Sequence, residues 1–219
     1  MKLFCGYDER EDIGFRVFEH SVRKTTLHDV EIIKLDSKGL PVGSNDFTCS
    51  RFLVPWLCGF KGMAVFADAS DMLCRSDITE LEHLFDPECA VQVVKHDYRT
   101  RHPIKYRMTD MQCPNRDYPR KNWASLMVIN CAHPAWHSMT PEVISEVGQR
   151  PAYLLGMEWL PSDNIGSIPD HWNRLVDEGQ DVVGASILHW TAGIPAFDFY
   201  ADAPGSEYWH AELAQLEQP

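Results

Sequence analysis

A continuous apolar run from Met63 to Ala67 leads directly into two aspartates, Asp68 and Asp71. An unbroken apolar run that ends at a polar turn is typical of a strand buried on both faces of a parallel sheet. Ligands of such sheets bind in the crevice beyond the carboxyl ends of the strands. The pattern therefore predicts two carboxylates at the rim of a crevice, close enough to share a divalent cation. Alternatively, Asp71 caps a helix and Asp68 is a solvated turn residue, because aspartate favours both positions.

The rest of the chain alternates between short β-branched runs and helical periodicity. In residues 12–24, for example, Phe15, Phe18 and Val22 follow the spacing of one helix face. The expected strands span residues 2–6, 30–35, 63–67, 90–95, 123–130 and 185–190. The expected helices span residues 12–24, 47–60, 77–85, 140–147 and 207–216. A strand, a helix and a second strand in succession form the βαβ unit of an α/β protein. No repeat or linker interrupts residues 1–219, so we expect one α/β domain.

Residues 96–122 form a long polar segment with little periodicity, which is typical of a functional or mobile loop. Its basic residues are Arg99, Arg101, Lys105, Arg107, Arg116, Arg120 and Lys121. Such side chains can close over a diphosphate, although for most of them a solvated loop is the simpler interpretation. Lys121 is the one retained as a candidate, because it adjoins the apolar stretch that begins at Asn122.

The overall composition narrows the class of protein. A formal charge of −12 argues against a nucleic-acid partner, but leaves room for a nucleotide bound through local cations or a metal. No apolar run is long enough to span a bilayer, and no signal peptide is visible. The seven cysteines are scattered and contain no C-x-x-C pair, which favours reduced thiols and a cytoplasmic protein.

Three groups of candidate ligands stand at expected strand ends: Tyr7 with Asp8, Asp68 with Asp71, and His189. Carboxylate oxygens with one imidazole suit Mn²⁺ or Mg²⁺, and such a cation neutralises charge on a phosphate leaving group. A buried, hydrogen-bonded histidine is the alternative interpretation of His189. The motifs of serine hydrolases, P-loop enzymes, dinucleotide-binding domains and zinc metalloproteases are absent.

Four ordered pieces of the chain resemble nucleotide-sugar glycosyltransferases of the A-type fold, in the neighbourhood of family 8. They are residues 50–52 (Ser-Arg-Phe), 66–73 (Phe-Ala-Asp-Ala-Ser-Asp-Met-Leu), 122–130 and 189–195 (His-Trp-Thr-Ala-Gly-Ile-Pro). The resemblance covers most of the chain. It implies a single Rossmann-like domain with a mostly parallel central sheet.

The resemblance also implies roles for individual residues. Asp68, Asp71 and His189 would hold Mn²⁺ (or Mg²⁺) on the diphosphate of the donor. The implied nucleotide and donor contacts are Tyr7 and Asp8 at the base and ribose, Arg51 and Lys121 at the sugar or phosphates, Asn122 and Ser125 at the sugar, and Gly193 against the diphosphate. We expect Asp163 on the acceptor side.

The chain departs from the family pattern at three places, of which the mildest is Ala196-Phe197 rather than Trp after Pro195. The usual D-x-D motif here contains an additional residue, Ala69 or Ser70, so either the loop bulges or only one acid binds the metal directly. Asp71 is then the firmer ligand. The family's F-N-S-G-V motif places its sugar-binding asparagine on Trp123, with Asn122 one position away.

The predicted function is metal-dependent transfer of a sugar from a nucleotide-diphosphate donor, expected to be UDP-linked, to an unknown hydroxyl acceptor. The resemblance implies retention at the anomeric carbon. Two alternatives stay open: another metal-dependent phosphate-ester enzyme, such as a nucleotidyltransferase or phosphohydrolase, and a non-catalytic sugar-nucleotide binder.

Overall fold

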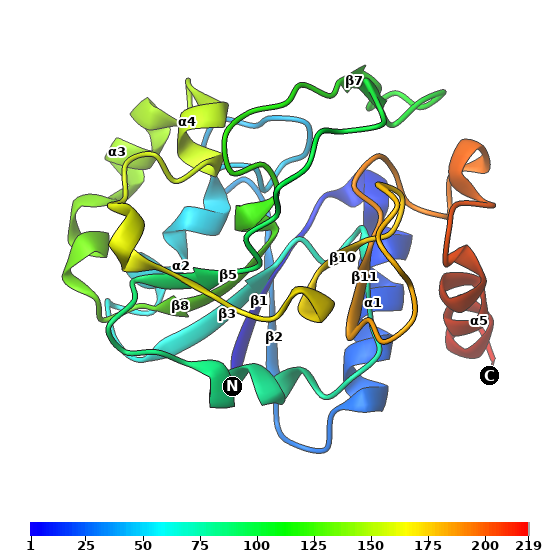
Figure 1. Cartoon of the computed structure of the whole chain (residues 1–219), viewed down its shortest axis with the longest axis horizontal. Coiled ribbons are helices and arrows are strands. Elements are labelled where there is room, and N and C mark those ends of the chain that lie inside the picture. Colours follow the sequence, from blue (N-terminus) through cyan, green and yellow to red (C-terminus); the bar gives the residue numbers. More distant parts are fainter. Residues whose placement is uncertain (219) are drawn as a thin grey trace.

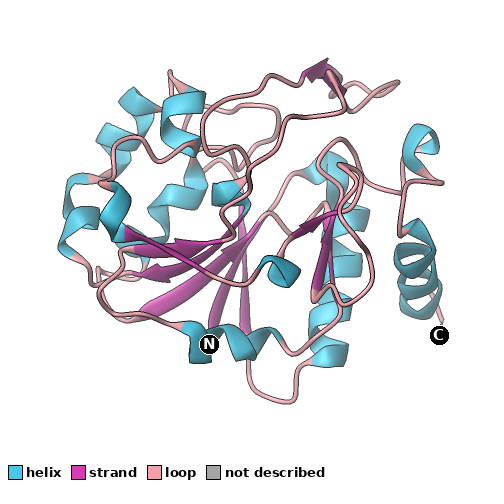
Figure 2. Cartoon of the chain, in the orientation of Figure 1, coloured by secondary structure: helices cyan, strands magenta, loops and turns pink. Residues whose placement is uncertain are grey.

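The computed structural model describes residues 1–218 and is built on a central six-stranded sheet with the order β2-β1-β3-β8-β5-β9 (Figures 1 and 2). These strands are β1 (Lys2–Gly6), β2 (Glu31–Leu35), β3 (Met63–Ala67), β5 (Val91–Val93), β8 (Leu126–Asn130) and β9 (Ile165–Ser167). Only β8 runs antiparallel to its two neighbours, β3 and β5, and every other neighbouring pair is parallel. The mostly parallel α/β sheet predicted from the sequence is therefore confirmed.

Helices cover both faces of this sheet (Figure 2). One side carries α1 (Asp12–Thr25), a second sheet of β10 (Arg174–Leu175), β11 (Ile187–His189) and β4 (Met72–Cys74), and the outer helix α5 (Ser206–Leu216). The other side carries α2 (Val54–Leu57), α3 (Pro141–Val147) and α4 (Pro151–Leu155). In residues 1–218, no helix is long and apolar enough to cross a membrane.

The buried strand β3 divides the hydrophobic core into two layers. Successive side chains of a strand point to opposite faces. Accordingly, Phe66 packs into the cluster on the α2 side of the sheet, whereas Val65 packs with Phe15 and Phe18 of α1. All residues from Ala64 to Ala67 are fully buried, so β3 is the buried central strand that its apolar run predicts.

Two expected elements are shorter in the structure because the backbone turns within them. The predicted helix 47–60 is a 3-10 helix, Ser50–Leu53, followed by the single turn of α2, which ends before the left-handed Gly59. The predicted strand 123–130 begins only at Leu126. The three preceding residues form a 3-10 turn after Asn122, whose φ of 61° is left-handed.

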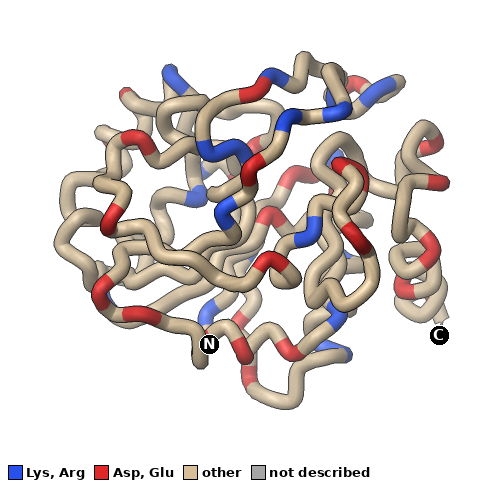
Figure 3. The backbone as a smooth tube through the Cα atoms, in the orientation of Figure 1, with Lys and Arg blue, Asp and Glu red and all other residues tan. Residues whose placement is uncertain are grey.

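The segment 96–122 crosses above the carboxyl ends of the strands (Figure 1). Its only regular structure is a hairpin of two-residue strands, β6 (Ile104–Lys105) and β7 (Cys113–Pro114), as expected for a long polar loop. Figure 3 shows its Lys and Arg positions following the chain over this end of the sheet. The basic segment thus lies above the edge of the sheet at which the turn with Asp68 and Asp71 follows β3.

Helix α1 approaches that acidic turn closely at Gly14. A Cβ added at Gly14 would lie 2.1 Å from the carbonyl oxygen of Ser70. The absence of a side chain at this position therefore allows α1 to pack directly against the backbone between the two aspartates.

We predict that Gly14→Ala destabilises the protein by about 1–3 kcal/mol, because the overpacking cost exceeds the gain in helix propensity of about 1 kcal/mol. Arg16→Ala, at an exposed position of the same helix, is the matched control and should change stability little. Chemical denaturation of both variants measures the difference. Equal stability of the two variants would contradict the close packing.

Candidate active site

The turn after β3 brings Asp68 and Asp71 to the same side of the backbone. Ala69 adopts a left-handed φ of 62°, and the Ser70 amide donates to the carbonyl oxygen of Asp68 at 2.7 Å. The loop therefore bulges. The bulge accommodates the additional residue that separates the two aspartates, compared with a D-x-D motif. Asp71 leads into strand β4, so the alternative in which it caps a helix is wrong.

Strand pairing brings His189 to the same turn. Strand β11 pairs antiparallel with β4, and His189 lies opposite Met72, next to Asp71. The His189 Nε2 atom lies 3.3 Å from Asp71 Oδ2. One ligand atom each from Asp68, Asp71 and His189 lies within 4.8 Å of the others, and all three residues are buried. The predicted trio is thus brought together.

A buried amide orients the imidazole of His189. Asn173, which is fully buried, donates from Nδ2 to Ser125 Oγ at 2.8 Å and presents Oδ1 to His189 Nδ1 at 2.9 Å. Because Oδ1 can only accept, Nδ1 carries the proton. In the neutral ring, the lone pair therefore sits on Nε2, which faces the aspartates. Hydrogen bonds of this kind commonly fix the ligating nitrogen of a metal-bound histidine.

Arg51 compensates the charge of Asp68. Its guanidinium donates to Asp68 Oδ1 at 2.6 Å and to the carbonyl oxygen of Ala124 at 2.9 Å, and both side chains are almost inaccessible to solvent. Burial raises the pKa of the Asp68 carboxyl to about 6, while the Arg51 charge acts in the opposite direction. The pair anchors the start of the acidic turn to the helix that precedes β3.

Asp71 and His189 form a second buried pair. Burial alone would raise the pKa of Asp71, but the adjacent imidazole of His189 holds it below its ordinary value. Burial lowers the pKa of His189, and the carboxylate of Asp71 outweighs this and raises it. The other oxygen of Asp71, Oδ1, is buried without a hydrogen-bond partner. Two carboxylates, one of them with an unpartnered oxygen, together with one imidazole form a donor set that suits a divalent cation such as Mn²⁺.

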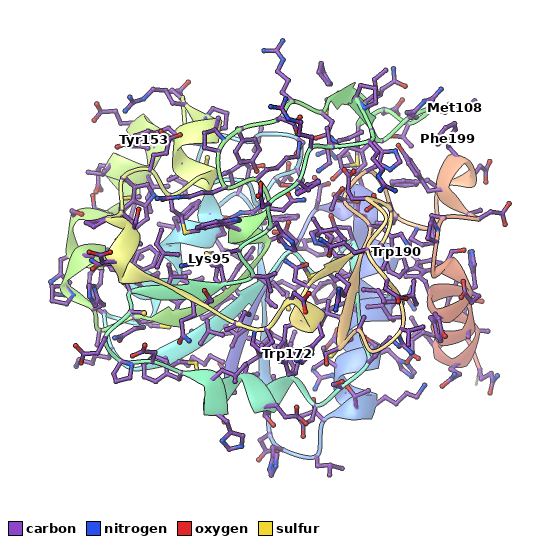
Figure 4. All side chains as sticks on the ribbon, viewed as in Figure 1. Lys95, Met108, Tyr153, Trp172, Trp190 and Phe199 are labelled. Atoms are coloured by element: carbon purple, nitrogen blue, oxygen red, sulfur yellow. The ribbon has the colours of Figure 1, made fainter. Side chains whose placement is uncertain are left out.

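A cavity of about 610 Å³ opens beside Asp68. Its walls come from the residue 43–51 segment, the 105–125 segment and the α4 region. Positive side chains dominate among its charged residues, which are Arg51, Asp68, Lys105, Arg116, Lys121, Arg150 and Glu158. Tyr118 and Tyr153 add aromatic faces, and Figure 4 shows Tyr153 on the α4 side. The cavity thus combines cations and ring faces next to the acidic turn.

Four of the residues predicted to contact the donor line this cavity, namely Arg51, Lys121, Asn122 and Ser125. The Lys121 ammonium donates to Asn115 Oδ1 at 2.6 Å and to the carbonyl oxygen of Arg116 at 2.8 Å. Burial, followed by the charge of Lys105, lowers the pKa of Lys121 to about 8. Ser125 Oγ donates to the Asn122 carbonyl at 2.7 Å and so links the cavity wall to Asn173.

The other predicted residues lie outside the cavity wall. At the end of β1, the Tyr7 hydroxyl donates to Asp12 at 2.9 Å, and Asp8 accepts from the Asp46 amide at 3.1 Å. Gly193 lies against Tyr200, because an added Cβ would approach that ring to 2.4 Å. Asp163 is exposed on the 3-10 helix Ser162–Asn164.

Sequence reasoning missed Asn173 and Glu11. Asn173 stands in an irregular aromatic stretch, where nothing in the sequence marks it as a partner of His189. Glu11 precedes α1 as one more acid in an acidic run, yet it is 1% exposed and its Oε1 has no partner. Burial, followed by the charge of Asp71, raises the pKa of Glu11 well above its ordinary value. Glu11 therefore belongs to the polar cluster around the acidic turn.

The class of the fold follows from solved structures to which the chain is similar. No protein-family profile matches the chain. The galactosyltransferase LgtC, solved with donor and acceptor sugar analogues, superimposes with a TM-score of 0.62 at 14% identity, over 100% of this chain and 97% of LgtC. The bifunctional glycosyltransferase WbbM gives 0.67 at 13% identity, over 98% of this chain and 49% of WbbM. The chain therefore has the A-type glycosyltransferase fold.

A third solved structure, the glycosyltransferase GlyE of Streptococcus pneumoniae, gives a TM-score of 0.63 at 15% identity, over 97% of this chain and 60% of GlyE. A much closer relative in sequence is Protein CDI of Arabidopsis thaliana. It is 35% identical over 233 aligned positions, which span 99% of this chain and 87% of the plant protein. The chain belongs to the family of this plant protein.

We predict that Arg51→Met destabilises the protein by about 3–5 kcal/mol, because it leaves the Asp68 carboxylate buried without its cation. The double variant Arg51→Met with Asp68→Asn removes the charge as well and should recover a large part of that loss. Urea denaturation of the two single variants and the double variant gives the coupling energy. Additive losses would show that the two side chains do not depend on each other.

Proposed function

We propose that this protein is a glycosyltransferase that moves a sugar from a nucleotide-diphosphate donor, in the first instance a UDP-sugar, to a hydroxyl group of a glycan or small-molecule acceptor. The observation that carries the proposal is the group of Asp68, Asp71 and His189 beside the basic cavity. In addition, the chain has the fold of known glycosyltransferases. The fold alone does not specify a donor, so the donor class rests on the chemistry of the site.

The metal of this proposal is Mn²⁺ or Mg²⁺, held by Asp68, Asp71 and His189. The unpartnered Oδ1 of Asp71 and the Nε2 lone pair of His189 support this assignment. When bound, the cation would neutralise charge on the diphosphate of the donor. The bulged turn allows both aspartates to contribute, so the proposal includes Asp68 as well as Asp71.

The remaining roles belong to side chains around the cavity. Arg51 and Lys121 would contribute positive potential toward the donor phosphates, where fixed charges in a water-poor site act strongly. Asn122 and Ser125 stand on the cavity wall, in a position to bind the donor sugar. Tyr7, Asp8 and Gly193 are proposed to contact the nucleotide. None of the three lines the cavity, so a structure with bound nucleotide is the direct test of these contacts.

We further propose that the anomeric configuration is retained. The cavity is lined by two carboxylates, Asp68 and Glu158. Asp68 is bound to Arg51, and Glu158 lies on the outer α4 side, so neither is placed as a covalent nucleophile. Retention, which the resemblance to family 8 implies, would then proceed by attack of the acceptor hydroxyl on the same face as the departing diphosphate. Asp163 remains the proposed polar group on the acceptor side.

The cellular setting is part of the proposal. All seven cysteines are free, which fits the reduced, cytoplasmic protein predicted from the sequence. The excess of acidic residues argues against a nucleic-acid partner and leaves room for a nucleotide bound through local cations or a metal.

The central prediction concerns Asp71. Replacement by alanine should abolish Mn²⁺-dependent hydrolysis of the cognate UDP-sugar, because it removes a ligand and leaves His189 without its carboxylate. Asp202→Ala, which replaces an exposed aspartate in the turn before α5, is the control and should keep full activity. Circular dichroism of both variants checks the fold.

A panel of sugar nucleotides and nucleoside triphosphates, tested by thermal shift with and without Mn²⁺, measures the ligand class. Metal-dependent stabilisation by sugar nucleotides supports the proposal. A preference for triphosphates would favour a nucleotidyltransferase or phosphohydrolase, and full activity of Asp71→Ala would end the metal assignment. Binding without turnover would identify a non-catalytic binder.

A further inference from the structure

Lys105 is a cation on the cavity wall that no carboxylate neutralises. It lines the cavity together with Arg51 and Asp68. Arg51 is paired with Asp68, and the Lys121 ammonium is occupied by Asn115 and the Arg116 carbonyl. Within residues 1–218, Lys105 makes neither a side-chain hydrogen bond nor an ion pair within 4.0 Å. It is therefore the cavity lysine whose ammonium is available for a ligand.

The backbone around Lys105 is fixed to the segment that follows His189. Lys105 pairs with Cys113 in the hairpin. The amide of its neighbour Tyr106 donates to the carbonyl oxygen of Ala192 at 2.7 Å, and the Tyr106 ring is 1% exposed. At the outer end of the hairpin, in contrast, Met108 projects into solvent (Figure 4). The base of the hairpin thus holds Lys105 in place, although the tip is free.

Next, the Arg107 amide donates to the Tyr200 hydroxyl at 2.9 Å, and Tyr200 itself packs against Gly193. Three consecutive hairpin residues are therefore tied, directly or through a neighbour, to the turn that carries His189. A loop lysine that served only solubility would not need this anchoring.

The positive charge of Lys105 acts on the buried acidic residues around the turn after β3. It lowers the pKa of Asp68, Asp71 and Glu11, although burial and nearer groups act more strongly on each of them. It also lowers the pKa of Lys121, another lysine of the cavity wall. Lys105 thus lies within electrostatic range of the acids while it forms an ion pair with none of them. A divalent cation would offset the two aspartates and leave this ammonium as positive charge available to an anion.

We propose that Lys105, rather than Lys121, contacts the diphosphate of the donor and stabilises it as it departs. This assignment rests on the proposed function. In the reaction, the bond between the anomeric carbon and the phosphate oxygen breaks, and its electron pair stays on that oxygen. The acceptor oxygen forms the new bond to the anomeric carbon, and its proton passes to the departing phosphate oxygen. Lys105 would share the negative charge that develops there, as amino-acid cations do at phosphoryl groups.

The test compares Lys105→Met, the charge-preserving Lys105→Arg, and Lys95→Met. Lys95 is an exposed lysine at the end of β5 that does not line the cavity, and Figure 4 shows its position. Isothermal titration of each variant with UDP and with UMP, in the presence of Mn²⁺, measures how much the second phosphate contributes to binding. A parallel titration with GDP and GMP covers a different base.

We expect Lys105→Met to bind the diphosphate about tenfold or more weakly and the monophosphate nearly as well as the unmodified protein. Lys105→Arg should retain most of the affinity, and Lys95→Met all of it. The thermal midpoint of Lys105→Met should change little, because Lys105 has no hydrogen bond or ion pair to lose and its ammonium only lies over the Tyr106 ring, 5.5 Å from the centroid; this separates the role from a packing effect.

Two other results overturn the assignment. If the unmodified protein binds the diphosphate and Lys105→Met binds it equally well, Lys105 does not contact the diphosphate, while the proposed function stands. If the unmodified protein binds neither diphosphate with Mn²⁺, the proposed function fails, and the role of Lys105 fails with it.

Discussion

The burial of two carboxylates at the end of β3 is the constraint on which the site depends. A buried carboxylate is costly unless a cation and hydrogen bonds compensate it. Asp68 has Arg51, and Asp71 has His189. Each compensating group comes from a different element, one before β3 and one more than a hundred residues after it. The pairing of β4 with β11, the packing of α1 at Gly14 and the amide of Asn173 all serve to hold these partners in position.

The central part of this arrangement could be predicted from the sequence. The rest could not, because it depends on contacts between distant segments. The buried run of β3 and the facial spacing in α1 are local patterns, so both elements were predicted with nearly their observed bounds. The grouping of Asp68, Asp71 and His189 followed from their strand ends and from the family resemblance, and the structure confirms that they meet. The bulge was left open, because a left-handed alanine has no sequence signature. Asn173 was not singled out, and Lys105 was named only within the basic set from which Lys121 was retained, since the importance of both arises only from contacts across the fold.

The hairpin links the turn that follows His189 to the cavity wall. A polar segment without periodicity gives no register from sequence, yet here it is anchored at Ala192 and Tyr200 and brings Lys105 to the cavity wall. Asp71 and His189 are buried and do not line the cavity, whereas Asp68 and the basic side chains do. The same segment therefore contributes a cation to the cavity wall and is fixed to the turn that follows His189.

The most direct measurement of the central claim is pulsed electron paramagnetic resonance of Mn²⁺ bound to the protein with UDP. The account predicts one Mn²⁺ that shows nitrogen coupling from an imidazole and phosphorus coupling from the diphosphate, with the nitrogen signal lost in His189→Gln. A bound Mn²⁺ that retains its nitrogen coupling in His189→Gln, or that shows no phosphorus coupling with UDP present, would contradict the account.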